Sequence, residues 1–277
     1  MPFRSSGDPY GTTDKLDEAL LQVMALRLEA RGQHPKFRKM LDDYLDAMGI
    51  DAAKSVLDMG SGTGVVARAI ARRPGFSGRV VGVDLSRYLA SAAERLAREE
   101  GLADRVAFQV GDTRSLELAG GTFDAVVAHT LLSHVEDPLA VVKEAARVVR
   151  AGGTVGIFDG DFASLTFGHA DPGKGKAYDE ALVGAVSASP RVMRQMPRLL
   201  QAAGLELLAS FPYVLTEIGK ADFWRSGFES FRMLMPKVGA MTDEEAEAWA
   251  EALRKDSERG VFFGSSNYYS YVARRRV

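Results

Sequence analysis

The chain has 277 residues, of which 46% are hydrophobic and 26% charged, and its formal net charge is −2. This size and composition fit one large α/β domain, and the small charge gives no field that would attract nucleic acid or an anionic membrane. The chain has no cysteine, which excludes disulfides, thiolate catalysis and cysteine-ligated metal centres. No apolar run is long enough to span a bilayer and no secretory signal is visible, so we expect a cytoplasmic protein.

The first fifty residues are expected to form an N-terminal helical cap, residues 1–50. Residues 1–13 are rich in Gly, Ser, Thr and Pro, which predicts a mobile arm. Apolar residues at helical spacing then predict helices over residues 13–30 and 35–48, with Gly49 ending the second. Both helices precede the first predicted strand, so we expect them to cover a ligand site.

Strands alternate with helices through the middle of the chain. Strands are predicted at residues 55–58, 79–84, 106–110, 123–128 and 154–158, and helices at 63–73, 86–100 and from 138. A short helical turn is expected around residues 114–117. Mostly apolar strands that alternate with helices predict a parallel sheet covered on both faces, with ligands at the carboxyl ends of the strands.

The last third of the chain is less regular. We predict a loop at residues 168–175, a helix at 191–203, a strand at 205–215, helices within 220–258, and an interrupted strand at 261–263 and 268–273. The ligand-binding α/β domain is thus expected to comprise residues 51–219 and 260–277, with a helical lid insertion at 220–259. Aromatic and Met residues of that insertion are at helical spacing, which favours core packing first and a pocket wall second. The insertion and the helices of residues 14–48 are expected to close over the site.

A glycine-rich turn, Gly60-Ser61-Gly62-Thr63-Gly64, follows the first predicted strand. Its spacing differs from the Gly-x-Gly-x-x-Gly pattern typical of dinucleotide pyrophosphates. Asp58, two positions before the turn, would repel phosphate but attract the ammonium and sulfonium groups of S-adenosylmethionine. Asp84 ends the second strand, where a carboxylate can accept hydrogen bonds from two ribose hydroxyls. S-adenosylmethionine is therefore the predicted cofactor.

These positions resemble the sequence motifs of class I S-adenosylmethionine-dependent methyltransferases. Residues 56–64, 82–86, 109–113 and 123–138 resemble the four motifs in order, and residues 148–153 resemble the stretch before the fifth strand. The resemblance implies a Rossmann-like doubly wound sheet of seven strands, mostly parallel with one antiparallel strand. Within the family, the chain is most similar to small-molecule methyltransferases, including those of ubiquinone and menaquinone biosynthesis.

The resemblance also implies which residues hold the cofactor. The turn and Asp58 would line its methionine part, Asp84 its ribose, and Leu85 one face of its adenine. Arg31 is the candidate partner of the cofactor carboxylate because it is a cation in the expected cap, although it could equally be a surface charge. The complete predicted set is Asp58, Gly60, Ser61, Gly62, Gly64, Asp84, Leu85, Asp112, Thr113, His129 and Arg31.

Methyl transfer from a sulfonium is an in-line displacement, so the protein mainly has to orient the acceptor and exclude water. The acceptor atom could be O, N or C, and a base is needed chiefly for a hydroxyl. The base candidates are His129, His134, Asp159 and Asp161, and His129 is favoured because it directly follows a strand. His134 is also read as a packing residue.

The sequence indicates a partly apolar small molecule as the acceptor. It shows no basic stripe typical of nucleic-acid binding and no metal-ligand spacing among its four histidines. It gives no sign of oligomeric state. Two alternatives stay open: a protein that binds S-adenosylmethionine on the same fold without transferring methyl, and an NAD-dependent oxidoreductase, which Asp58 and the glycine spacing disfavour.

Overall fold

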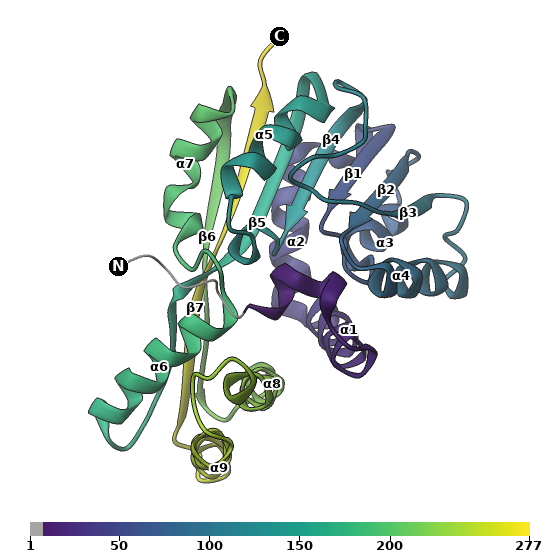
Figure 1. The fold of residues 1–277 in the computed structure, drawn as a ribbon. Helices are drawn as coiled ribbons and strands as arrows, with labels where there is room; N and C mark the ends of the chain where they lie inside the picture. Colours follow the sequence, from purple (N-terminus) through teal and green to yellow (C-terminus); the bar gives the residue numbers. More distant parts are fainter. Residues whose placement is uncertain (1–7) are drawn as a thin grey trace.

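A seven-stranded sheet forms the centre of the molecule (Figure 1), and the computed structural model describes residues 8–277 of the chain. The strand order is β3-β2-β1-β4-β5-β7-β6. β7 runs antiparallel to β5 and β6, whereas the other pairs are parallel. The predicted doubly wound sheet with one antiparallel strand is therefore confirmed. The strands are β1 (Ser55–Met59), β2 (Arg79–Asp84), β3 (Val106–Val110), β4 (Phe123–His129), β5 (Val149–Phe167), β6 (Leu205–Gly219) and β7 (Phe262–Arg275).

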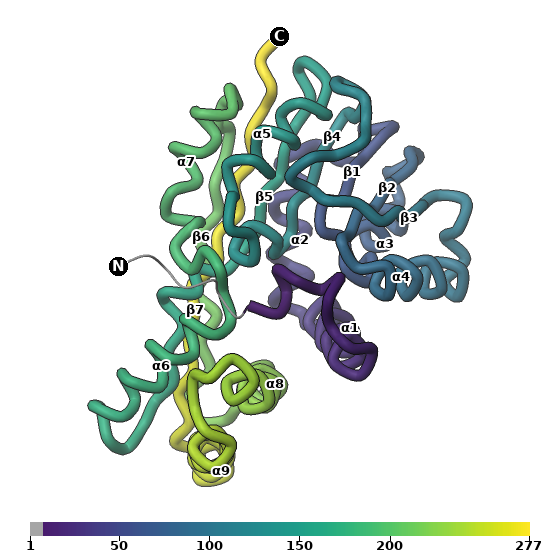
Figure 2. The backbone as a smooth tube through the Cα atoms, in the orientation of Figure 1, coloured from purple at the N-terminus to yellow at the C-terminus, as the bar shows by residue number. Residues whose placement is uncertain are grey.

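Helices cover both faces of the sheet, as the tube in Figure 2 shows. One face carries the core that includes α2, α3, α8 and α9, and the opposite face carries the core with α5 and α7. The helices are α1 (Glu18–Gln33), α2 (Pro35–Met48), α3 (Val65–Arg72), α4 (Arg87–Glu99), α5 (Pro138–Val148), α6 (Pro172–Val186), α7 (Val192–Ala202), α8 (Phe223–Lys237) and α9 (Asp243–Glu258).

Capping residues account for several helix boundaries. Helix α2 ends at Gly49, whose φ of 65° is left-handed and therefore suits glycine. The Ser86 side chain accepts the Leu89 N–H at the start of α4, and Thr242 with Glu245 forms the expected capping box of α9. Such signals act within one turn of the chain, which is why they could be read from the sequence.

The sequence interpretation is wrong in four places. Residues 172–175 begin helix α6 instead of continuing a loop, with the Asp171 side chain capping the backbone N–H groups of Gly173 and Lys174. Strand β5 continues to Phe167, and β7 is one continuous strand paired along β6. Residues 114–117 form no helix; an isolated turn, closed by the Ser115 N–H on the Asp112 carbonyl, stands there instead.

The N-terminal arm has regular structure over its described part, which its composition did not predict. Residues 1–7 lie outside the described residues, but Pro9–Lys15 form a 3₁₀ segment, η1. Asp8 is only 2% exposed, and its side chain caps the segment by accepting the Tyr10 N–H. We call residues 8–15 the N-terminal strap.

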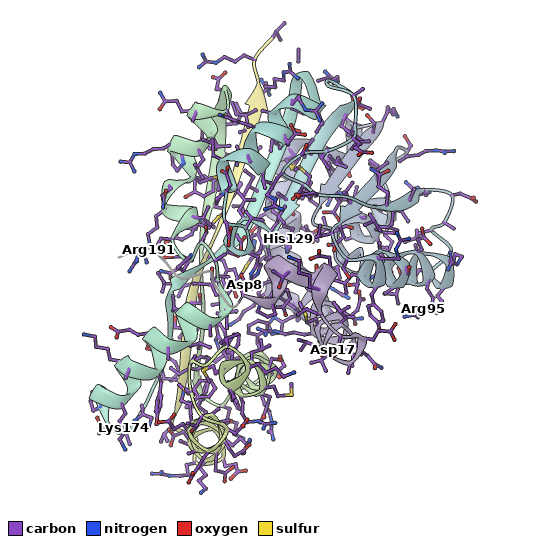
Figure 3. The ribbon with its side chains drawn as sticks, in the orientation of Figure 1. Asp8, Asp17, Arg95, His129, Lys174 and Arg191 are labelled. Atoms are coloured by element: carbon purple, nitrogen blue, oxygen red, sulfur yellow. The ribbon has the colours of Figure 1, made fainter. Side chains whose placement is uncertain are left out.

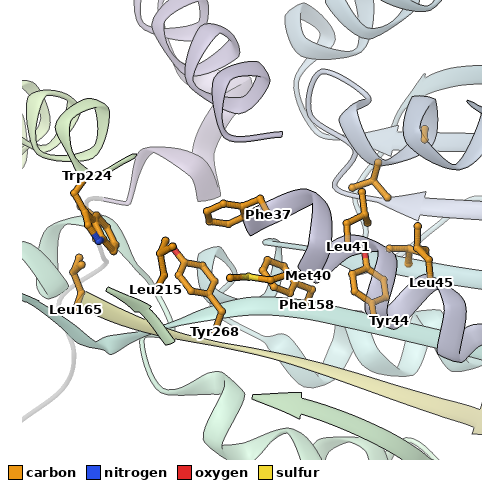
Figure 4. Close-up of a cluster of buried hydrophobic side chains, with 14 of the residues drawn as sticks. Phe37, Met40, Leu41, Tyr44, Leu45, Phe158, Leu165, Leu215, Trp224 and Tyr268 are labelled. Carbon is orange, nitrogen blue, oxygen red and sulfur yellow. The ribbon is translucent and has the colours of Figure 1, made fainter. Parts of the chain in front are cut away.

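Aromatic residues of α8 pack in the core, the first of the two roles expected for them. Trp224, Phe228 and Phe231 are buried with Phe167 and Trp249 in one cluster. The same cluster continues between α2 and the sheet, where Phe37, Tyr44, Phe158 and Tyr268 are labelled in Figure 4. The division into a cap, an α/β domain and a lid stays a prediction.

No helix within residues 8–277 combines the length and apolar composition that crossing a bilayer requires.

Candidate cofactor-binding and catalytic site

A cavity of about 490 Å³ lies at the carboxyl ends of β1, β2 and β4. Its floor includes residues 60–63 of the glycine turn and Asp58, Asp84 and His129 at the ends of those strands, whereas the predicted residue Gly64 does not line it. Its cover comes from α1, α2 and the N-terminal strap, whereas no residue of 220–259 contributes to its wall. This position agrees with the rule that ligands of doubly wound sheets bind beyond the carboxyl ends of the strands.

The glycine turn brings its backbone close to neighbouring side chains. Gly60, Gly62 and Gly64 have φ values of 69°, 53° and 78°, which a residue with a Cβ adopts only with strain. A Cβ at Gly64 would lie 2.5 Å from Phe108 Cζ. The Ser61 hydroxyl is buried and has no hydrogen-bond partner within residues 8–277. The turn is therefore a tight cradle with one unpaired polar atom.

Asp58 lies beneath the turn and is 1% exposed. One carboxylate oxygen accepts the Ala67 N–H of α3 at 3.1 Å. Burial raises the pKa of Asp58 to about 7, although the Ala67 hydrogen bond opposes the shift. The carboxyl group is thus poised to ionise when a cation enters the cavity.

Asp84 joins the end of β2 to the glycine turn. Its Oδ2 accepts the Gly62 N–H at 2.8 Å, and its Oδ1 accepts the Ser86 N–H at 2.9 Å. Burial raises the pKa of Asp84, while both backbone hydrogen bonds lower it. An ionised carboxylate has about four acceptor positions, so Asp84 retains capacity for further donors such as hydroxyls.

Leu85, Asp112 and Thr113 line the same end of the cavity as Asp84. The Asp112 carboxylate is paired with Arg114, whose terminal nitrogen lies 2.7 Å from Oδ2. This hydrogen bond lowers the pKa of Asp112. The structure therefore brings all three predicted residues to the cavity, with Asp112 already paired on one side.

Arg31 of α1 forms part of the cavity wall. Its guanidinium donates to the Thr130 hydroxyl at 2.7 Å and forms no ion pair within residues 8–277. Burial lowers the pKa of Arg31. Thr130 itself has a φ of 53°, and such strained residues cluster at functional sites. A partly buried cation with no anionic partner in the described part of the chain makes this wall suitable for a carboxylate.

His129 lies at the end of β4, where Figure 3 labels it. Its Nδ1 is 3.0 Å from the hydroxyl of Tyr44, and its ring stacks on Phe158 with 4.4 Å between centroids. Burial, with a smaller contribution from the charge of Arg31, holds the pKa of His129 well below its usual value. His129 is therefore a neutral imidazole fixed within an aromatic stack.

His134 has a different environment, although it also lines the cavity. Its Nδ1 lies 2.9 Å from Oδ2 of Asp8, and the Tyr10 ring lies 4.8 Å from its own. Burial lowers the pKa of His134, but the charge and hydrogen bond of Asp8 and the charge of Asp159 outweigh it, so the net shift is upward. Nε2 forms no hydrogen bond within the described part of the chain.

Asp159 and Asp161, the carboxylate candidates for a base, do not line the cavity. Asp159 accepts hydrogen bonds from the backbone and hydroxyl of Ser133, and Asp161 pairs with Arg194. The sequence reasoning did not identify Asp8 or Tyr44 as site residues. Asp8 lies in a Gly- and Ser-rich segment and Tyr44 fits the apolar face of α2, so neither carried a functional signal.

A second polar cluster lies outside the cavity. His34, Glu217 and Asp222 have potential ligand atoms within 4.8 Å of one another. The Glu217 carboxylate already accepts the N–H groups of Asp222, Phe223 and Trp224 at the start of α8. Those donors and the positive end of the helix disfavour a metal ion there, and make Glu217 a helix cap.

Comparisons with known proteins agree with this geometry. A methyltransferase domain model matches residues 57–157. The ubiquinone biosynthesis O-methyltransferase of Chromobacterium violaceum is 31% identical over 170 residues, which cover 60% of this chain and 67% of that protein. Methyltransferase GfsG of Streptomyces halstedii is 28% identical over 216 residues, covering 77% of this chain and 74% of GfsG.

Other matches differ in extent. An uncharacterized 37.1 kDa protein in transposon TN4556 of Streptomyces fradiae is 33% identical, and the match covers 83% of this chain but 65% of that protein. Among solved structures, the cyclase SpnF has a TM-score of 0.62 at 20% identity over 97% of each chain. A geranyl diphosphate methyltransferase in complex with GPP and sinefungin has a TM-score of 0.53 at 20% identity, over 86% of this chain and 78% of its own. These two structures support the fold alone.

The fold, the glycine cradle and the sequence relatives together define a Rossmann-like methyltransferase. The chain belongs to the S-adenosylmethionine-dependent methyltransferases, with S-adenosylmethionine as the methyl donor. This membership decides against the NAD-dependent oxidoreductase.

Proposed function

We propose that this chain methylates a hydroxyl oxygen of a partly apolar small molecule, with His134 as the base. One observation carries the proposal: a cavity-lining imidazole has Nδ1 hydrogen-bonded to a buried carboxylate, and its Nε2 has no partner within residues 8–277. Such an arrangement fixes the tautomer with a lone pair on Nε2. An oxygen acceptor requires removal of a proton, whereas a carbon or neutral amine acceptor makes less use of this group.

The cavity fits S-adenosylmethionine by charge and by shape. We assign Asp58 to the ammonium, because its buried carboxyl has one backbone partner, and Arg31 to the carboxylate, because it has no anionic partner within residues 8–277. The turn of Gly60, Gly62 and Gly64 with Ser61 would hold the methionine part.

The remaining assignments follow the order of the strands. Asp84 would accept the ribose hydroxyls, and Leu85, Asp112 and Thr113 would surround the adenine. The cofactor supplies an electrophilic methyl group on a sulfonium whose leaving group is already activated.

His134 replaces His129 as our preferred base because their environments differ. The pKa of His129 lies well below its usual value, so its ring is a weak proton acceptor. The pKa of His134 is raised by Asp8, so its ring is the stronger acceptor once it is neutral. We assign His129 instead to positioning, since Tyr44 and Phe158 hold it against the cavity.

The walls around the two histidines favour a partly apolar acceptor. Tyr10, Phe37 and Leu41 contribute ring or aliphatic surface there, and Arg31 and Glu136 add polar groups. Mixed walls of this kind are typical of small-molecule sites. Relatives named as O-, N- and sterol C-methyltransferases leave the acceptor atom open, and it is the histidine environment that favours oxygen.

A labelled-methyl assay tests the proposal. The protein is incubated with methyl-labelled S-adenosylmethionine and matched panels of phenols, aliphatic alcohols, amines and activated carbon acids. We expect label on hydroxyl oxygens, and a rate that rises with pH through the pKa of His134, since only the neutral ring accepts a proton. Label on nitrogen or carbon alone would refute the oxygen assignment. Cofactor binding without transfer to any panel member would favour a non-methylating protein of the same fold.

A further inference from the structure

We propose that closing the N-terminal strap assembles the base, because Asp8 of the strap holds the catalytic imidazole of His134 in its proton-accepting orientation. The inference rests on the proposed role of His134 and extends it to a segment that the sequence marked as a mobile arm. Asp8 is a positioning residue in this scheme, acting on the acceptor only through His134.

The strap meets His134 at three points. The Asp8 carboxylate is hydrogen-bonded to Nδ1 of His134, and the Tyr10 ring packs against the imidazole. Gly11 lies so close that an added Cβ would be 2.5 Å from the His134 carbonyl oxygen. All three contacts require the same placement of the strap. The orientation of His134 is therefore coupled to the position of residues 8–15.

Asp8 also joins the strap to a third segment. Its Oδ2 accepts the Ala188 N–H at 3.0 Å, next to Ser187, whose hydroxyl donates to the Ser133 carbonyl. The Ser189 N–H donates to that same carbonyl. The segment between α6 and α7 thus fixes the backbone beside His134 and donates a hydrogen bond to Asp8. Asp8 can accept this hydrogen bond only when the strap lies across the cavity.

The strap is also a cover of the cavity, since residues 8 and 10–15 all line it. A cover over a site with bound cofactor must move for the acceptor to enter, as lids of many enzymes do. When the strap lifts, Asp8 leaves and the ring of His134 loses its Nδ1 partner. Proton acceptance is then confined to the closed state, in which water is excluded.

The charges around His134 make this coupling measurable. Asp8 faces it from the strap, Asp159 from β5, and Arg31 from α1. Asp159 belongs to the sheet and Arg31 to α1, which packs against α2, α3 and α4, so neither depends on the strap for its position. Loss of Asp8 therefore removes the closest negative charge and leaves a buried imidazole beside a cation.

Histidine-labelled NMR of the full chain, saturated with S-adenosylhomocysteine, tests the inference without any acceptor. In the wild type we expect neutral His134 to carry its proton on Nδ1. In Asp8→Ala we expect the Nε2–H form to appear and the pKa of His134 to fall by about one to three pH units. Asp8→Asn, which keeps the shape of the side chain, should also lower the pKa.

Gly11→Ala separates the strap from the charge of Asp8. This variant keeps Asp8 but forces the strap away from the His134 carbonyl, so we expect the same two changes at His134 in smaller amount. Gly184→Ala is the matched control, because a Cβ there meets nothing within 4 Å. The signals of His34 and His169 report whether each variant remains folded.

Two results would overturn the inference. One is an unchanged tautomer and pKa of His134 in Asp8→Ala. The other is a normal His134 in a folded Gly11→Ala protein whose strap is displaced, which would leave Asp8 without a dependence on strap closure. The measurement needs no turnover. If the methyl-transfer assay fails but the tautomer and pKa of His134 change in the variants as expected, the proposed function is refuted and the coupling between the strap and His134 stands.

Discussion

The two ends of the cavity are built from different kinds of contact. At the cofactor end, Asp84 and Gly62 are only 22 positions apart, and backbone N–H groups make most of the bonds. At the end assigned to the acceptor, Asp8 and His134 are 126 positions apart and meet through side chains. Local backbone contacts give a rigid cradle, whereas distant side-chain contacts give a site that can open. Substitutions at each end of the cavity test this difference.

Replacing His134 by Gln should have the largest effect. It removes the proposed base, so turnover of a hydroxyl acceptor should fall by about 10²–10⁴-fold. Affinity for S-adenosylhomocysteine, measured by titration calorimetry, should change little because the cofactor cradle is intact. His169→Gln, on the loop before α6, is the control. Equal losses of turnover and affinity would place His134 in the cofactor site instead.

Substituting Gly64 by Ala should damage the cradle most. The left-handed φ and the contact with Phe108 together predict a loss of about 2–5 kcal/mol in the free energy of unfolding, measured in urea. Gly101→Ala shares the left-handed φ but has open space, so it should lose only about 1–2 kcal/mol. Similar losses in both variants would show that the Phe108 side chain moves to make room for the added Cβ and that the glycine turn is not rigid.

Asp58→Asn should separate binding from stability. We expect a cofactor affinity weakened by about 10–100-fold, from the loss of a charged partner. The folded pKa of Asp58, about 7, exceeds its unfolded value of 3.8. Its contribution to stability is therefore fully present below about pH 4 and lost as the pH rises through about 7.

The same substitution thus predicts a change in pH dependence. Without cofactor, the wild type should become less stable between about pH 4 and 7, and Asp58→Asn should lessen that decline, as thermal unfolding across this range can show. S-adenosylhomocysteine binding near pH 7 should also release protons, read as buffer-dependent heats in calorimetry. Binding heats that do not depend on the buffer would mean that Asp58 is already ionised.

Tyr44→Phe should have the smallest effect. It leaves His129 Nδ1 without its partner, which predicts a loss of about 1–3 kcal/mol in unfolding free energy and a modest fall in turnover. Tyr178→Phe, which alters a tyrosine on α6 away from the cavity, is the control. A fall in turnover as large as that of His134→Gln would make His129 the base.

The cofactor end could be predicted from the sequence because its information is local. The turn, Asp58 and Asp84 belong to one β-α-β stretch, and α2, β2 and β3 have the predicted bounds. The cofactor roles of these residues stay predictions, although their placement around one cavity agrees with them.

The other end could not be predicted, for physical reasons. The pairing of Asp8 with His134 depends on how the N-terminus packs against a distant segment, and composition alone suggested a mobile arm. His129 was preferred as the base because it directly follows a strand, but burial and the charge of Arg31, which only the fold reveals, lower the pKa of its ring. Helix α6 was missed because Gly173 and Gly175 masked its Asp-Pro start.

One buried cation bears on how the protein responds to ionic strength. Arg68 of α3 has a side chain that is 4% exposed, and it pairs with Glu29 of α1 at 2.5 Å and with Glu100 after α4. At about 0.1 M salt, mobile ions screen the interaction between exposed charges over a distance of about 10 Å, but they screen buried pairs much less. Concentrated salt should weaken an exposed pair such as Arg95 with Glu99, yet leave α1 anchored over the glycine turn.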